Sequence, residues 1–115
     1  MAKNPDPDKI ARDFGDAVNM TPATLEKWLK TDESRSVGDT NTRGSSGGES
    51  TGHKSGRRIV DILRKTKVEL EDTDYEHMRK VVGYVRRHSA QRPAGDVTET
   101  RWRYSLMNWG RDPKK

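Results

Sequence analysis

The longest regular pattern of apolar and polar residues runs from Thr73 to Arg92 and predicts one amphipathic helix. At about 100° per residue, one side of this segment gathers the stripe that a helix buries against a core. That side holds Tyr75, Met78, Val81, Val82, Val85 and Ser89. Thr73, followed three residues later by Glu76, has the capping-box pattern, so we expect the helix to begin there.

Two shorter patterns predict helices in the N-terminal half. Ile10, Phe14 and Val18 recur every four residues and indicate a helix from about residue 8. Thr21 followed by Pro22 is typical of a helix cap and first helical residue, and the apolar face of that second helix includes Trp28. We expect the two helices to form a hairpin, with Trp28 packed against the long helix.

The C-terminal half shows two more such patterns. Ser55 is the predicted N-cap of a helix that buries Ile59, Ile62 and Leu63. A last helix, capped by Asp96 or Thr98 and ended by Gly110, carries Trp102, Leu106 and Trp109 on one face. The sequence therefore predicts an all-α fold of about five short-to-medium helices in a small orthogonal bundle.

The segment between the second and third predicted helices has a different composition. Residues 34–56 contain six Gly, six Ser and three Thr, with Val37 as the single large apolar residue. Such a composition does not order itself by burial, so residues 39–51 are predicted to form a flexible internal loop. Its glycines do not match a phosphate-binding loop, because no strand precedes them and no Gly-Lys-Ser/Thr is present. We expect one domain over residues 8–113, with frayed termini at 1–7 and 111–115.

Composition adds a charge asymmetry to this picture. The net charge is +5, but residues 1–50 carry −2 and residues 51–115 carry +7, so an anionic partner is expected on the second half. Ile, Leu, Val and Phe number only 17 of 115, which allows a small core. With no cysteine, no Sec-type signal and no transmembrane stretch, we expect a soluble cytoplasmic protein, nucleoid-associated in a bacterium or archaeon.

The first candidate binding site lies where the loop meets the third predicted helix. A helix N-terminus stabilises a phosphate through its free N–H groups, and cations here reinforce that effect. The candidate residues are His53, Lys54, Ser55, Gly56, Arg57 and Arg58. The alternative is an ordinary helix start whose basic side chains are simply solvated.

Two further groups are candidates for contact with nucleic acid. The polar side of the long helix carries Arg79, Lys80, Arg86 and Arg87, with the small residues Gly83 and Ala90 between them. Small residues there allow a flat anionic partner to approach, although a close helix contact and a solvated face explain the same pattern. In the last helix, Arg103 and Asn108 lie off the tryptophan stripe and have the chemistry to bond base edges.

Catalysis and metal binding find little support in the sequence. The three histidines are His53, His77 and His88, and the last two lie about 16 Å apart on one helix, too far to share a metal. No recognisable nucleophile and base pair is present. We therefore expect no enzyme activity, no metal and no cofactor.

Several motifs together resemble a known family. They are LEKWLKTDES at 25–34, SGRRIV at 55–60, HMRKVVGYV at 77–85, AQRP at 90–93 and WRYSLMNWG at 102–110. Over about residues 10–113 the chain is similar to an uncharacterised family of small basic microbial proteins, classed as a domain of unknown function. Its members are commonly labelled DNA-binding without an established mechanism, so the resemblance implies DNA as the partner and assigns no site. Family members carry an apolar residue near Ser89 and a histidine near Arg111, where this chain departs from the pattern.

Charge and resemblance lead to the same functional prediction. We expect a small nucleic-acid-binding protein, with DNA as the expected form, that acts through phosphate contacts and does not associate with membranes. The alternative is a protein-interaction or structural module that uses the Trp-rich C-terminal helix. Salt separates the two, because phosphate binding weakens steeply with salt whereas an apolar interface is nearly indifferent to it.

Overall fold

The computed structural model describes residues 6–37 and 51–114, and all regular secondary structure in these ranges is helical. The α-helices in this part of the chain are α1 (Pro7–Ala17), α2 (Pro22–Leu29), α3 (Asp32–Ser36), α4 (Thr51–Leu63), α5 (Asp72–Ser89) and α6 (Arg101–Asn108). A short 3-10 helix, Lys67–Glu69, connects α4 to α5. The predicted all-α class is confirmed. The helix that sequence patterning missed is α3, because five residues are too few to show an amphipathic period.

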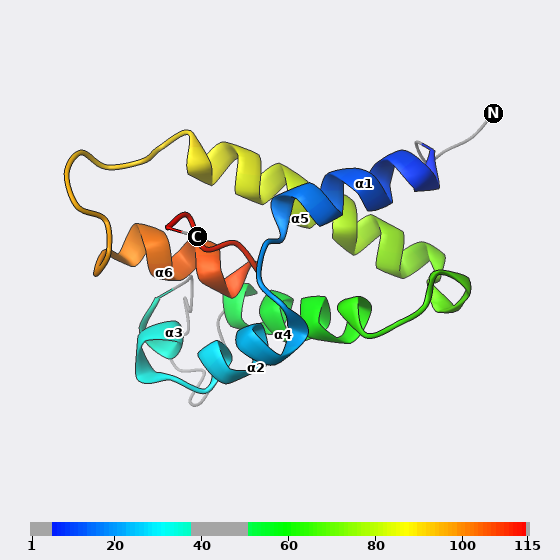
Figure 1. The fold of residues 1–115 in the computed structure, drawn as a ribbon, viewed down its shortest axis with the longest axis horizontal. Coiled ribbons are helices and arrows are strands. Elements are labelled where there is room, and N and C mark those ends of the chain that lie inside the picture. Colours follow the sequence, from blue (N-terminus) through cyan, green and yellow to red (C-terminus); the bar gives the residue numbers. More distant parts are fainter. Residues whose placement is uncertain (1–5, 38–50, 115) are drawn as a thin grey trace.

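The helices form two layers that are joined at one end by α6 (Figure 1). α1 packs along α5 in one layer, and α2 packs along α4 in the other. α6 contacts α2, α3, α4 and α5. The predicted hairpin of the first two helices is therefore wrong, because each of them packs along a helix from the second half of the chain.

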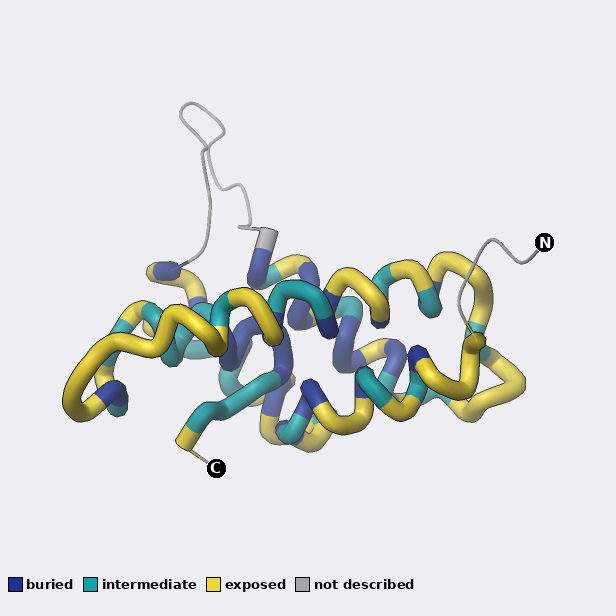
Figure 2. Tube along the Cα trace, turned by 90° about the horizontal axis from the view of Figure 1, so that it is seen from above, coloured by how far each residue is buried: buried dark blue, intermediate teal, exposed yellow. Residues whose placement is uncertain are grey.

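The core lies between the layers, where the inward side of each helix is buried (Figure 2). Leu25, Ile59, Val81 and Leu106 are fully buried and come from α2, α4, α5 and α6. On α5 the predicted stripe is buried from Met78 to Val85, whereas Ser89 is exposed. In the last turn of α5 it is His88 that contacts the rest of the protein, since its carbonyl accepts from the Trp102 indole N–H at 2.7 Å and its ring stacks on that of Trp102.

Trp28 packs on a different helix from the one expected. Its indole N–H donates a 2.8 Å hydrogen bond to Oδ1 of Asn108, and its ring lies 5.5 Å from that of Tyr104. Both partners belong to α6, not to the long helix α5. The apolar spacing of α2 indicates that Trp28 is buried, but it does not indicate which helix Trp28 packs against.

Some helix ends follow the predicted chemistry. Thr21 caps α2 by accepting the Thr24 N–H at 3.1 Å, and Pro22 is the first helical residue, as expected. Gly110 follows α6 with a φ of 87°, a conformation that glycine adopts without strain. The N–H groups of Gly110 and Arg111 return to the last turn in the pattern of a glycine C-cap.

Other caps lie at residues that sequence reasoning did not choose. α5 begins at Asp72, and Asp74 rather than Glu76 accepts the N–H that precedes the helix, that of Glu71, at 3.0 Å. α6 is capped by Thr100, whose side chain accepts the Arg103 N–H. Asp96 and Thr98, the two expected caps, instead bond to each other in the preceding turn.

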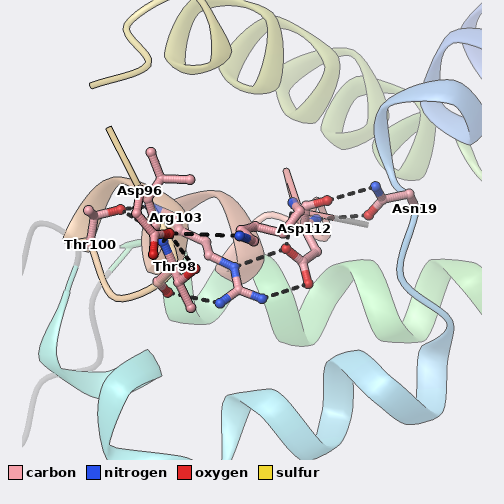
Figure 3. Close-up of polar contacts among 8 residues, drawn as sticks. Asn19, Asp96, Thr98, Thr100, Arg103 and Asp112 are labelled. Atoms are coloured by element: carbon pink, nitrogen blue, oxygen red, sulfur yellow. Dashed lines mark hydrogen bonds and ion pairs between the residues drawn. The ribbon is translucent and has the colours of Figure 1, made fainter. Parts of the chain in front are cut away.

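A network that we call the C-terminal clamp ties the end of the described chain to the link between α1 and α2 (Figure 3). Its members are Asn19, Thr98, Arg103 and Asp112. Arg103 makes two 3.0 Å bonds to the Asp112 carboxylate and donates to the Thr98 carbonyl at 2.8 Å. The Asn19 side chain exchanges two bonds with the Asp112 backbone, at 2.8 and 3.0 Å. We expected residues 111–115 to fray, but these bonds hold Asp112 in place.

Candidate nucleic-acid interface

The helix that carries the predicted phosphate site begins earlier than expected, because α4 starts at Thr51. Ser55 is therefore not the helix cap. Ser55 is the fifth residue of α4 and is 3% exposed. The predicted helix start at Ser55 is wrong, and of the basic residues in the predicted site His53 and Lys54 lie in the first turn of α4, whereas Arg57 and Arg58 lie beyond it. Of the predicted loop 39–51, residues 39–50 lie outside the described part of the chain.

Gly52 and Gly56 are packing positions within α4. A Cβ added at Gly56 would lie 2.6 Å from the Asn108 carbonyl oxygen and 2.7 Å from the Leu29 side chain. At Gly52 it would lie 3.2 Å from Nε1 of Trp109. Both glycines belong to the Gly/Ser-rich segment 34–56, and Gly56 was predicted to be a phosphate-binding residue, but they allow α2 and α6 to approach α4 closely.

The basic residues of α4 line an open groove that faces α5, which we call the α4–α5 groove. Its volume is about 510 Å³. The lining consists of Lys54, Ser55, Arg57, Arg58, Asp61, His77, Lys80 and Trp109. Four cationic side chains therefore surround the groove against one carboxylate. Four of the six residues of the predicted first site are here, joined by Lys80 of the predicted second site.

Arg58 is held at the groove by a buried carboxylate. Asp74 of α5 is 1% exposed, and its Oδ1 accepts from Arg58 at 3.0 Å. Its Oδ2 accepts from Lys65 at 2.7 Å and from the Glu71 N–H at 3.0 Å. The bond from Lys65, together with those from Glu71 and Arg58, lowers the Asp74 pKa to about 2 against the opposing effect of burial. Asp74 is thus ionised at neutral pH and fixes the position of Arg58.

His77 lies at the groove in its neutral form. Burial lowers its pKa, and the nearby charges of Arg58 and Lys80 lower it further. Its Nε2 is 3.0 Å from the hydroxyl oxygen of Ser55. Because Ser55 is buried, its hydroxyl is not accessible as a nucleophile, and the bond serves to orient the His77 ring.

A series of nearly parallel aromatic rings ends at the same groove. His77 lies 6.3 Å from Trp109, which lies 4.3 Å from Tyr84, and interplanar angles are 11° and 12°. The series continues through His88 to Trp102, with ring separations of 5.1 and 6.1 Å. His77 and Trp109 both line the groove, so aromatic surface is placed beside the cations.

A second depression, the α2–α4 hollow, adjoins the groove on the side of α4 that faces α2. Its volume is about 290 Å³, and Glu26, Leu29, Lys30, Arg35, His53, Arg57 and Val60 line it. His53 donates from Nε2 to the Leu29 carbonyl at 2.7 Å. Arg57 borders both depressions. His53 therefore belongs to the hollow rather than to the groove.

The predicted cationic face of α5 is divided between two surfaces. Lys80 faces the α4–α5 groove, whereas Arg79 and Arg86 line a separate depression of about 310 Å³ against α1. Arg86 also lies 3.7 Å from the carboxylate of Asp13. Arg87 is exposed, and a Cβ added at Gly83 would lie 3.1 Å from its guanidinium. The four predicted contacts therefore do not form one site.

The two candidates in α6 are engaged inside the protein. Asn108 is fully buried: its Oδ1 accepts from Trp28 and Ser34, and its Nδ2 donates to the Ser34 carbonyl at 3.0 Å. It presents no amide edge to a base, so that expectation is wrong. Arg103 is 19% exposed and belongs to the C-terminal clamp. Both residues support the fold.

The functional candidates that sequence reasoning missed are His77, Trp109, Lys30 and Arg35. His77 was considered only as a metal ligand, although it lies three residues from Lys80 and hence on the same side of α5. Trp109 was correctly expected in the core, since it is 5% exposed, yet it also borders the groove. The sequence gives no signal that Lys30 and Arg35 line the same depression as Arg57.

Residues 6–37 and 51–114 contain neither a group of candidate metal ligands nor a helix suited to span a membrane. Within these ranges, no three His, Cys, Asp or Glu side chains are grouped so that they would hold a metal ion. Among the same residues, no helix combines the length and the apolarity that crossing a membrane requires.

Fold and groove define a small all-helical domain with a cationic depression between two of its helices. The chain belongs to the family described as "Protein of unknown function (DUF3140)", whose model matches residues 13–107. Neither the curated proteins nor the solved structures contain a match.

Proposed function

We propose that this protein binds nucleic acid, with DNA as the expected form, through phosphate contacts in the α4–α5 groove. The observation that supports this proposal is the lining of the groove, in which Lys54, Arg57, Arg58 and Lys80 face one acid, Asp61. Cations gathered in a concave site attract a polyanion and release its counterions on binding.

The fixed position of Arg58 adds to the proposal. A guanidinium held by Asp74 loses less side-chain entropy when it meets a phosphate than a mobile one does. The other three cations are exposed, two on α4 and one on α5. The groove thus combines an arginine that Asp74 orients with three cations at the protein surface.

The experiment is fluorescence anisotropy of labelled duplex and single-stranded DNA, titrated with protein at several salt concentrations. The test variant is Lys54→Glu/Lys80→Glu, which changes the lining from four cations and one acid to two cations and three acids. Arg58 is left intact because its replacement would leave the buried Asp74 short of a partner. The matched control is Arg12→Glu/Lys27→Glu, which has the same charge change at exposed residues outside the groove.

The wild-type protein is expected to lose affinity steeply with salt. Each phosphate contact contributes about 0.9 to the slope of log affinity on log salt for duplex DNA, so the test variant is expected to flatten it by about 2. The control variant should keep most of the slope. If neither DNA binds at low salt, or both variants weaken binding equally, the groove is not the phosphate site.

The alternative, a protein-interaction module, stays a prediction. Trp109 is 5% exposed and Trp102 is half-buried, so an apolar partner would have little tryptophan surface to contact. Among the described residues, Val68 is the large apolar side chain that is exposed.

A further inference from the structure

We infer that the α4–α5 groove accepts an unpaired nucleotide of a single strand, with its base beside His77 and its phosphates on the surrounding cations. This inference rests on the proposed function and specifies which form of nucleic acid the groove fits. It concerns the His77 ring, which binding through phosphates alone does not use.

The aromatic lining is the first reason. Phosphates need only cations and N–H donors, whereas this groove also presents the half-buried His77 ring beside them. His77 ends the series that runs through Trp109, Tyr84 and His88 to Trp102, with interplanar angles between 11° and 18°. Aromatic side chains beside a basic groove are the recurring means by which proteins hold unpaired bases.

The neutral state of His77 suits this role. A neutral imidazole beside a base requires no counter-charge, and Ser55 holds the ring through Nε2. The cations remain on the rim for the phosphates. Charge and aromatic surface therefore act on different parts of one nucleotide.

The concave shape is the second reason. In a duplex the bases are paired and stacked, so the backbone alone reaches a depression, and no base contacts a ring that lines it. A groove of about 510 Å³ gives an unpaired base room to enter. A single strand can therefore use the cations and the His77 ring together.

Continuity with the α2–α4 hollow is the third reason. Arg57 borders both depressions, and the hollow adds Lys30 and Arg35. A strand whose nucleotide occupies the groove can cross α4 at Arg57 and meet these cations next. A flexible single strand follows such a bent path, which a duplex is too stiff to follow.

The test compares four ligands by anisotropy competition at several salt concentrations. They are a thymidine oligonucleotide, the same length of strand with abasic tetrahydrofuran sites, the matching duplex, and free thymidine monophosphate. The abasic strand keeps the phosphates and lacks the bases. We expect the thymidine strand to bind at least about fivefold tighter than the abasic strand, since stacking of one base contributes about 1–3 kcal/mol.

Two substitutions assign that preference to the ring. His77→Leu removes the aromatic surface and is expected to bring the thymidine and abasic strands to nearly equal affinity. His77→Phe keeps a ring without the Ser55 bond and is expected to retain the preference. Circular dichroism of both variants establishes that α5 is intact, so a loss seen only in His77→Leu is due to the ring.

The outcomes separate this inference from the proposed function. Equal affinity for thymidine, abasic and duplex ligands with a steep salt dependence would overturn the base site and leave phosphate binding in place. Free thymidine monophosphate binding as tightly as the strand would overturn the assignment to a strand. Absence of binding to every ligand at low salt would overturn both.

Discussion

Replacing Asp74 by asparagine removes a buried negative charge while keeping the size of the side chain. In the native protein this carboxylate bonds to Lys65 at 2.7 Å, to the Glu71 N–H at 3.0 Å and to Arg58 at 3.0 Å. These bonds, led by that of Lys65, lower the Asp74 pKa from 3.8 to about 2. One pKa unit corresponds to about 1.4 kcal/mol, so the charged form contributes about 2 kcal/mol to the free energy of unfolding.

The sign of the pH dependence follows from the direction of this shift. A carboxyl group whose pKa is lower in the folded protein stabilises it above pH 3.8, where the unfolded chain is also ionised. That stability is lost as the pH falls towards 2. Asp74→Asn is therefore expected to be about 2 kcal/mol less stable than wild type at pH 7, with little difference at pH 2.

Urea unfolding followed by circular dichroism at several pH values measures this difference directly. The control is Asp72→Asn, an exposed carboxylate in the same helical turn, which is expected to change stability by less than about 0.5 kcal/mol. Other carboxylates that titrate in this range are common to all three proteins and cancel in the comparison. A gap that stays the same at pH 7 and pH 2 would refute the electrostatic account and indicate a packing effect.

Three further predictions concern the core and the groove. Gly56→Ala places a methyl group within 3 Å of backbone and side chain and should cost about 1–3 kcal/mol in thermal unfolding, whereas Gly15→Ala, with nothing within 4 Å, should be neutral or stabilising. Equal effects would contradict the close approach of α4. Asn108→Ala leaves the Trp28 indole without its acceptor and should cost about 1–3 kcal/mol with altered tryptophan fluorescence; an unchanged unfolding midpoint would count against it. NMR titration should place the His77 pKa below 6.5, because burial disfavours the charged imidazole. The neutral form is compatible with the fold above pH 6.5, and this stability is lost as the pH falls through the lowered pKa of the folded protein. A measured His77 pKa above 6.5 would contradict this account.

Helix positions were predictable where one face of a segment carries the whole signal. Ile10 and Phe14 in α1, and the stripe from Met78 to Val85 in α5, repeat at helical spacing and are buried as expected. The pairing of helices was not predictable from the same pattern. An apolar stripe indicates that one face of a helix is buried, but it does not indicate which helix packs on that face.

The candidate site was predictable in its residue types but not in its geometry. Lys54, Arg57 and Arg58 were chosen for their charge, yet the reason given, a helix start at Ser55, was wrong. Glycine has two opposite uses, loop flexibility and close helix packing, and only the neighbours of Gly56 in space distinguish them. The side-chain amide of asparagine is likewise ambiguous in a sequence, because it can bond a ligand at the surface or polar groups in the core. Asn108 was expected at the surface, but its amide bonds Trp28 of α2 and Ser34 of α3 inside the protein.

The C-terminal clamp has a consequence for the order in which the chain can fold. Asn19 bonds to Asp112, 93 residues later, and α1 and α2 pack along α5 and α4. During synthesis the first two helices therefore emerge without the helices that cover their apolar faces. Contacts this distant in sequence slow folding compared with a bundle of neighbouring hairpins. The native fold becomes complete only after Asp112 has left the ribosome. Until then the apolar residues of α1 and α2 are exposed to solvent, and only the polar residues on the other sides of these two helices keep the segment in solution.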